Sequence, residues 1–109
     1  MKLAIVGSRN ICDIDISKYI LEKPSEIISG GAKGIDTLAA QYAKRNGIPL
    51  TEFLPDYEKY GRAAPIVRNK QIVSSADVVL ALWDGKSRGT LSSINYAKKL
   101  GKIVNIIEF

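Results

Sequence analysis

The sequence predicts an α/β domain with a three-layer, Rossmann-like architecture, in which helices cover both faces of a five-stranded parallel sheet. Short apolar runs alternate with amphipathic stretches along the 109 residues, the pattern of repeated βαβ units. The apolar runs are continuous, as in strands that are buried on both faces. Glycine-bearing loops follow three of these runs. We expect residues 1–109 to form a single domain.

The first strand is predicted at residues 3–7, an apolar run that ends in glycine. Asp13 or Asp15 can cap a helix that continues to about Lys23, where a proline ends it. A short second strand is expected at residues 26–29.

The second helix is expected to begin near Gly34 or Ile35, because apolar residues follow at helical spacing. An Asn-Gly pair at residues 46–47 is a good signal for its end. The third strand is predicted at residues 49–54, and a polar, aromatic connection fills residues 55–64.

The third helix is predicted to start at Pro65, since proline suits the first helical position, and to end near Ser75. The run at residues 77–83 is the clearest strand of the chain. A fourth helix is expected at residues 90–100, where a glycine stops it, and a fifth strand at residues 102–107.

Right-handed crossovers and a buried first strand give the strand order 3-2-1-4-5. The topological switch then lies between the first and fourth strands, and ligands of such sheets bind at the carboxyl ends of the strands there. We expect three loops to meet at this crevice, namely Gly7–Arg9, Ser29–Asp36 and Gly85–Thr90.

Composition excludes several classes of protein. The sequence is 46% hydrophobic and 25% charged, which is typical of an ordered globular domain. No apolar run reaches the roughly 20 residues of a membrane span, and the apolar start is too short for a signal peptide. We expect a cytoplasmic protein with no membrane partner. The lone Cys12 allows no intrachain disulfide and is expected to be buried or inert.

The chain contains no histidine, which excludes Ser-His-Asp and Cys-His sites within one chain and zinc sites built on histidine. We expect no metal site and no cofactor. The formal net charge of +5 favours an anionic partner, either a nucleotide or a nucleic-acid backbone. A basic surface that serves solubility is the alternative.

The loop at residues 29–36 has the features of a phosphate site. Its glycines lack a Cβ and let the backbone approach a ligand, and the loop opens a helix whose free N–H groups favour an anion. Lys33 adds positive charge, whereas Asp36 either complements the helix dipole or accepts hydrogen bonds from ribose hydroxyls. No spacing here fits GxGxxG or a Walker motif, and a tight turn without a ligand is the alternative.

Other polar residues are predicted at the same crevice. Arg9 can bind phosphate in a bidentate manner, and Thr90 either contacts the ligand or only caps a helix. Arg68 either faces the crevice or is a solvated helix residue, and Trp83 is expected to cover an edge of the core. No catalytic residue is assigned. The predicted ligand-binding residues are Gly7, Ser8, Arg9, Ser29, Gly30, Gly31, Lys33, Gly34, Asp36, Arg68, Asn69, Asp84, Ser87, Gly89 and Thr90.

The ordered set of motifs resembles the SLOG superfamily, above all its small stand-alone Rossmann-like nucleotide-binding members. The resemblance implies that the chain binds a nucleotide or nucleotide derivative, with the phosphate on glycine-rich loops. It also implies a homo-oligomer, because the family commonly pairs through helices. The motifs that carry the resemblance are Gly7–Arg9, Ser29–Asp36, Tyr60–Arg62, Arg68-Asn69, Ala76-Asp77 and Ser87–Thr90.

Two branches of the superfamily imply alternatives. DNA-processing protein A, which binds single-stranded DNA, has similar first and second loops and a similar Arg-Asn pair, so a single-stranded nucleic acid is a second candidate partner. The Lonely Guy phosphoribohydrolases have an arginine that matches Arg68 and a Gly-Thr that matches Gly89-Thr90, which implies hydrolysis of an N-glycosidic or phosphate bond. Their catalytic glutamate corresponds to Ser93 here, so Asp36 or Asp84 would have to replace it.

Overall fold

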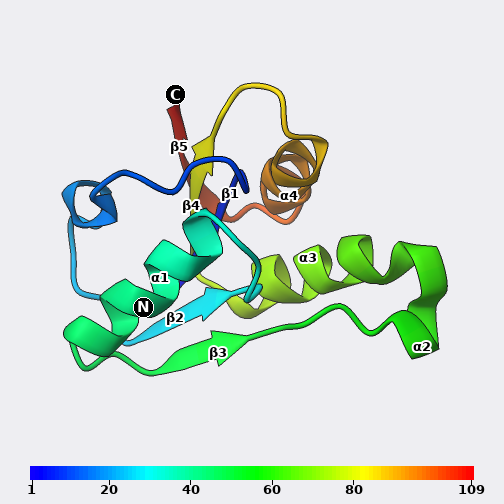
Figure 1. The fold of residues 1–109 in the computed structure, drawn as a ribbon, viewed down its shortest axis with the longest axis horizontal. Helices are drawn as coiled ribbons and strands as arrows, with labels where there is room; N and C mark the ends of the chain where they lie inside the picture. Colours follow the sequence, from blue (N-terminus) through cyan, green and yellow to red (C-terminus); the bar gives the residue numbers. More distant parts are fainter.

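The computed structural model describes residues 1–109 and contains one five-stranded parallel sheet of order β3-β2-β1-β4-β5 (Figure 1). The predicted strand order and the parallel arrangement are therefore confirmed. β1 lies at the centre, where Leu3 pairs with Ile27 on one side and with Val78 on the other. The strands are β1 (Lys2–Gly7), β2 (Glu26–Ser29), β3 (Leu50–Glu52), β4 (Val78–Trp83) and β5 (Ile103–Glu108).

Helices cover both faces of the sheet, as expected (Figure 1). α1 packs on one face together with a 3₁₀ turn, η1, and α3 and α4 lie side by side on the other. No helix is long and apolar enough to cross a membrane. The helices are α1 (Ile35–Arg45), α2 (Tyr57–Tyr60), α3 (Ala64–Ser75) and α4 (Arg88–Lys99), and the 3₁₀ turns are η1 (Ile16–Tyr19) and η2 (Gly61–Ala63).

Alternate side chains of the strands build two hydrophobic cores. Ile5 and Leu80 point toward α1, whereas Val6 and Val79 point toward α3 and α4, and all four are almost fully buried. The continuous apolar runs in the sequence therefore reflect burial on both faces.

The predicted helix between Asp13 or Asp15 and Lys23 is wrong, because only η1 forms there. Asp15 does cap this turn, and its Oδ1 accepts hydrogen bonds from both the N–H (3.1 Å) and the hydroxyl (2.6 Å) of Ser17. Short polar side chains that bond to the local backbone compete with helix formation. Ile16 is buried against the sheet and fixes the turn in place.

The polar, aromatic connection predicted at residues 55–64 contains α2 and η2 before α3 begins. Asp56 caps α2 by accepting a hydrogen bond from the N–H of Lys59 at 3.2 Å. These two short turns carry the chain from β3, at the edge of the sheet, to the start of α3.

Candidate functional site

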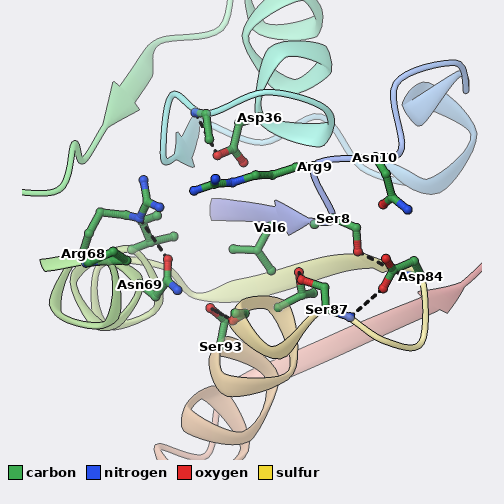
Figure 2. Close-up of a pocket in the computed structure, with 16 residues that line it drawn as sticks. Val6, Ser8, Arg9, Asn10, Asp36, Arg68, Asn69, Asp84, Ser87 and Ser93 are labelled. Atoms are coloured by element: carbon green, nitrogen blue, oxygen red, sulfur yellow. Dashed lines mark hydrogen bonds between the residues drawn. The ribbon is translucent and has the colours of Figure 1, made fainter. Parts of the chain in front are cut away.

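A cavity of about 430 Å³ opens at the carboxyl ends of β1 and β4, where the sheet changes its winding direction (Figure 2). This is the crevice that the strand order predicts as a binding site. Its walls come from the loops after β1, β2 and β4, from the first turn of α1, and from α3 and α4. The lining residues are Val6, Gly7, Ser8, Arg9, Asn10, Ala32, Asp36, Pro65, Arg68, Asn69, Ile72, Asp84, Ser87, Gly89, Thr90 and Ser93.

The structure brings most of the predicted site residues together in this lining and leaves a few outside it. The predicted residues in the lining are Gly7, Ser8, Arg9, Asp36, Arg68, Asn69, Asp84, Ser87, Gly89 and Thr90. Those outside the lining are Ser29, Gly30, Gly31, Lys33 and Gly34. Sequence reasoning missed Val6, Asn10, Ala32, Pro65, Ile72 and Ser93. A usable signal existed for two of them, because Asn10 extends the first loop and Ser93 lies one helical turn after Gly89.

The glycines of the second loop serve close packing between chain segments. Gly34 has a φ of +73°, and a Cβ there would lie 2.7 Å from the carbonyl oxygen of Ser8. A Cβ on Gly30 would lie 2.6 Å from a terminal nitrogen of Arg68. The absence of side chains therefore lets this loop pack against the loop after β1 and against α3. Lys33 lies on the exposed side of the same loop.

Asp36 occupies the position in the second loop where an anion was expected. Its Oδ2 accepts a hydrogen bond from the N–H of Ala32 at 3.1 Å. Burial raises the pKa of the Asp36 carboxyl, and the Ala32 N–H and the guanidinium groups of Arg68 and Arg9 oppose this rise. The Ser29 hydroxyl is buried and lies near the carboxyl without forming a hydrogen bond. A hydrogen-bond acceptor thus lies in the wall where a phosphate would need donors.

Arg68 is a buried residue of α3 with only 7% of its surface exposed, so it is not a solvated helix residue. Its Nη1 donates to the carbonyl oxygen of Gly30 at 2.9 Å and, more weakly, to that of Phe53 at 3.4 Å. Its Nε donates to Oδ1 of Asn69 at 2.9 Å. The guanidinium therefore joins α3 to the loops after β2 and β3 while it still lines the cavity.

Asp84 fixes the loop that leads from β4 into α4. Its Oδ1 accepts hydrogen bonds from the backbone N–H groups of Lys86 (2.8 Å) and Ser87 (2.7 Å), and its own N–H donates to Oγ of Ser8 at 3.1 Å. These two backbone donors lower the pKa of Asp84, and the N–H of Ser87 has the larger effect. The side chains of Ser8 and Asn10 lower this pKa further, by less than either backbone donor. The ionised carboxylate thus sets the start of α4, and the backbone N–H of Asp84 attaches this loop to the loop after β1.

The N-terminus of α4 is the part of the wall that is best suited to an anion. The backbone N–H groups of Arg88, Gly89 and Thr90 have no acceptor within the helix, and the last two residues line the cavity. No acidic side chain lies in the first turn. The hydroxyls of Ser87 and Thr90 are 3.3 Å apart and share a hydrogen bond. Free N–H groups, hydroxyls and the helix dipole together favour negative charge here.

Ser93 lies one turn further along α4, almost fully buried, and its hydroxyl donates to the carbonyl oxygen of Gly89 at 3.2 Å. The cavity therefore has a small hydroxyl at this position, where the Lonely Guy branch has a glutamate. Trp83 covers the edge of the core, and its Nε1 donates to the carbonyl oxygen of Ser87 at 3.0 Å. Cys12 is exposed, which excludes the buried alternative for this thiol, whereas an inert thiol stays a prediction. No cluster of three metal-binding side chains exists.

Arg9 supplies an exposed cation to the cavity. Its side chain extends from the end of β1 across the opening, between Asp36 on one side and Arg68 and Asn69 on the other (Figure 2). Figure 2 shows no hydrogen bond from its guanidinium to the other lining residues. Its donors are therefore free for a ligand that enters the cavity.

The comparisons with known proteins agree with the superfamily resemblance of the sequence. Residues 1–60 match a family model, YAcAr, described as the YspA, cpYpsA-related SLOG family. The fold is similar to the X-ray structure of DNA processing protein A from Streptococcus pneumoniae, with a TM-score of 0.81 and 24% sequence identity. The match covers 96% of this chain and 49% of that one, so the chain spans about half the length of the matched protein. No curated protein matches the sequence.

Proposed function

The chain belongs to the YspA, cpYpsA-related SLOG family, and we propose that it binds a nucleotide or nucleotide derivative in the cavity at the carboxyl ends of β1 and β4. The observation that carries the proposal is the free N-terminus of α4, which faces the cavity through Gly89 and Thr90. Arg9 lines the same cavity, and Figure 2 draws no hydrogen bond from its guanidinium. An anionic group such as a phosphate fits this combination of dipole, N–H groups and guanidinium.

We place the phosphate against α4 and not against the second glycine loop. In that loop the N–H of Ala32 already donates to Asp36, and the carboxylate would repel a phosphate. At α4 the carboxylate that lines the cavity, Asp84, points its hydrogen-bonded oxygen at the backbone of Lys86 and Ser87. The ligand would therefore have its negative end at α4.

Asp36 then suits the sugar of the ligand. It lies across the cavity from α4 (Figure 2), and carboxylate oxygens accept hydrogen bonds from ribose hydroxyls. The amide of Asn69 on the neighbouring wall offers a further donor. The cavity volume of about 430 Å³ lies in the lower half of the range of roughly 300–1,000 Å³ that is usual for small-molecule sites. This size fits a mononucleotide better than a dinucleotide.

The test is a thermal-shift assay against a panel of nucleotides, nucleosides and inorganic phosphate. At least one nucleotide should raise the melting temperature in a saturable manner, and the matching nucleoside should do so less. Arg9→Ala should weaken binding about tenfold or more, because a charge-assisted hydrogen bond is lost. Lys33→Ala is the matched control, since Lys33 lies outside the lining and its loss changes the net charge equally. The proposal fails if no nucleotide stabilises the protein, or if both variants weaken binding to the same extent.

Hydrolysis of an N-glycosidic or phosphate bond is a second candidate function, and the raised pKa of Asp36 within the cavity favours it. Ser93 in place of a glutamate argues against it. If the protein turns over such a ligand, Asp36→Ala or Asp84→Ala should abolish the activity. Chromatography of the nucleotide panel after incubation decides the question, and intact nucleotides throughout would reject hydrolysis.

Binding of a single-stranded nucleic acid is a third candidate, supported by the fold of DNA processing protein A and by the net charge of +5. Lys33 and Lys86, on loops near the cavity, and Arg88, at the start of α4, are exposed. Binding through such cations should weaken steeply with salt. A gel-shift assay that finds no complex even at low salt would exclude it.

A further inference from the structure

The two edges of the sheet differ in how well they are protected. β3 is an edge of three residues preceded by a proline, and short edges with proline resist pairing with another strand. β5 is an edge of six residues without proline, and no strand pairs with its outer side. A longer apolar edge of this kind is a template for pairing with another chain.

The outward-facing backbone groups of β5 can be identified from one hydrogen bond. The N–H of Phe109 donates to the carbonyl oxygen of Trp83 at 2.8 Å, so the backbone groups of Phe109 point toward β4. Backbone direction alternates along a strand. Val104 and Ile106 therefore direct their N–H and C=O groups away from the sheet, where no strand of this chain receives them.

Apolar side chains surround this edge. Ile103 is 63% exposed and Ile106 is 39% exposed. On the α1 side of the sheet, Ile103 borders an apolar hollow of about 220 Å³, which is also lined by Leu21, a leucine that is 93% exposed. On this side α1 packs against β1, β2 and β3, and only the short η1 segment forms near the β5 edge. The edge thus combines free backbone groups with uncovered apolar surface.

We propose that β5 is a self-association surface, on which β5 of a second copy of this chain pairs in the antiparallel direction around a two-fold axis at Asn105. The two sheets then join into one continuous sheet with five strands from each copy. In this register Val104 faces the partner's Ile106, and the outward N–H and C=O groups of both form ladder hydrogen bonds. This surface is independent of the nucleotide cavity and of the function proposed for it.

Charge complementarity selects this register. The same pairing places Lys102 opposite the partner's Glu108 at both ends of the ladder, and both side chains point to the same face of the sheet. Ile103 lies opposite the partner's Ile107 on the other face. A shift of the register by two residues would leave Lys102 or Glu108 facing an apolar residue. An isologous pairing closes after two copies and forms no filament.

The test is sedimentation of the full chain over a roughly hundredfold range of concentration. The wild-type protein should reach twice its mass of 11.9 kDa. Lys102→Glu and Glu108→Lys should each weaken the dimer about tenfold, because each places like charges opposite one another at both ends of the ladder. The double variant restores opposite charges and should bind within about threefold of the wild type. Lys44→Glu, on the exposed side of α1, is the control and should change nothing.

Val104→Pro provides a second test, because it removes an N–H that the monomer does not use. This variant should keep the circular dichroism spectrum of the wild type and sediment as a monomer. The proposal is overturned by a wild-type protein that stays monomeric, by single charge reversals that leave the dimer unchanged, by a double variant that fails to recover, or by a folded Val104→Pro dimer.

Discussion

The guanidinium of Arg68 donates a hydrogen bond of 2.9 Å to the carbonyl oxygen of Gly30, a residue 38 positions earlier in the chain. This contact joins α3 on one face of the sheet to the loop that opens α1 on the other. Because Arg68 is buried and also lines the cavity, the shape of the site depends on the same bond that holds these two elements together.

Arg68→Ala should lower the free energy of unfolding by about 3 kcal/mol, since the carbonyl oxygen of Gly30 and the amide of Asn69 lose a charged donor in a buried place. Arg62→Ala removes an exposed arginine from the same region and should change the free energy of unfolding by no more than about 0.5 kcal/mol. Urea denaturation measures both. Equal effects would mean that the buried contact does not stabilise the fold.

Gly34→Ala should destabilise the protein by about 3 kcal/mol or more, because the new methyl group would meet the backbone of Ser8 and Arg9 at a φ that only glycine adopts easily. Gly47 has a similar φ of +63° but open space around it, so Gly47→Ala should cost only about 1–2 kcal/mol. Thermal or chemical denaturation of the pair separates backbone strain from packing. A Gly34→Ala variant that is no less stable than Gly47→Ala would contradict the close packing of the two loops.

Asp36 and Asp84 should affect the pH dependence of stability in opposite directions. Burial raises the pKa of Asp36 in the folded state above its usual value of 3.8. At a pH between 3.8 and this raised pKa, the folded state binds more protons than the unfolded state. The free energy of unfolding therefore falls as pH rises through this range. The pKa of Asp84 is lowered by backbone hydrogen bonds, so its contribution is present above 3.8 and is lost as pH falls through its folded-state pKa.

At about pH 7, Asp36→Asn should therefore raise the free energy of unfolding and Asp84→Asn should lower it, and both differences should shrink toward acidic pH. Denaturation curves recorded from acidic to neutral pH show whether each variant raises or lowers the free energy of unfolding. If Asp36→Asn lowers stability at neutral pH, the ionised carboxylate is better accommodated than its burial implies.

Trp83 should report ligand binding at α4. It is the only tryptophan, and its indole N–H is bonded to the carbonyl oxygen of Ser87, the residue that caps α4. A phosphate at the first turn of α4 would change the electrostatic environment of the indole and hence its fluorescence. Titration with a stabilising nucleotide should give a saturable change in emission, with a midpoint that matches the one from calorimetry. Binding without any change in emission would place the ligand away from α4.

The sheet was predictable because its signals are local. Apolar runs predicted the strands. Their alternation with amphipathic segments predicted a parallel sheet, which the structure confirms together with the strand order. The predicted first helix failed because Asp15 bonds to Ser17 and stabilises a single turn in place of a longer helix.

The candidate site was predictable only in part. Arg9 and Thr90 follow strand ends, so topology alone placed them at the crevice. The hydrogen bond between Asp36 and Ala32 depends on the geometry of the loop, and the one between Arg68 and Gly30 joins distant elements. Residue spacing in the sequence predicts neither of them. Of the glycine-rich loops that were expected to hold the phosphate, these contacts leave the one at the start of α4 as the proposed position.

The central claim is that the cavity binds a nucleotide with its phosphate at the N-terminus of α4, and isothermal titration calorimetry tests it most directly. The nucleotide that stabilises the protein most should bind at one site per chain, and Gly89→Asp, which adds a carboxylate to the free first turn, should abolish the binding. Ser92→Asp, on the exposed side of the same helix, should leave it nearly unchanged. Absence of binding heat and of thermal stabilisation with every nucleotide, or undiminished binding to Gly89→Asp, would contradict the claim.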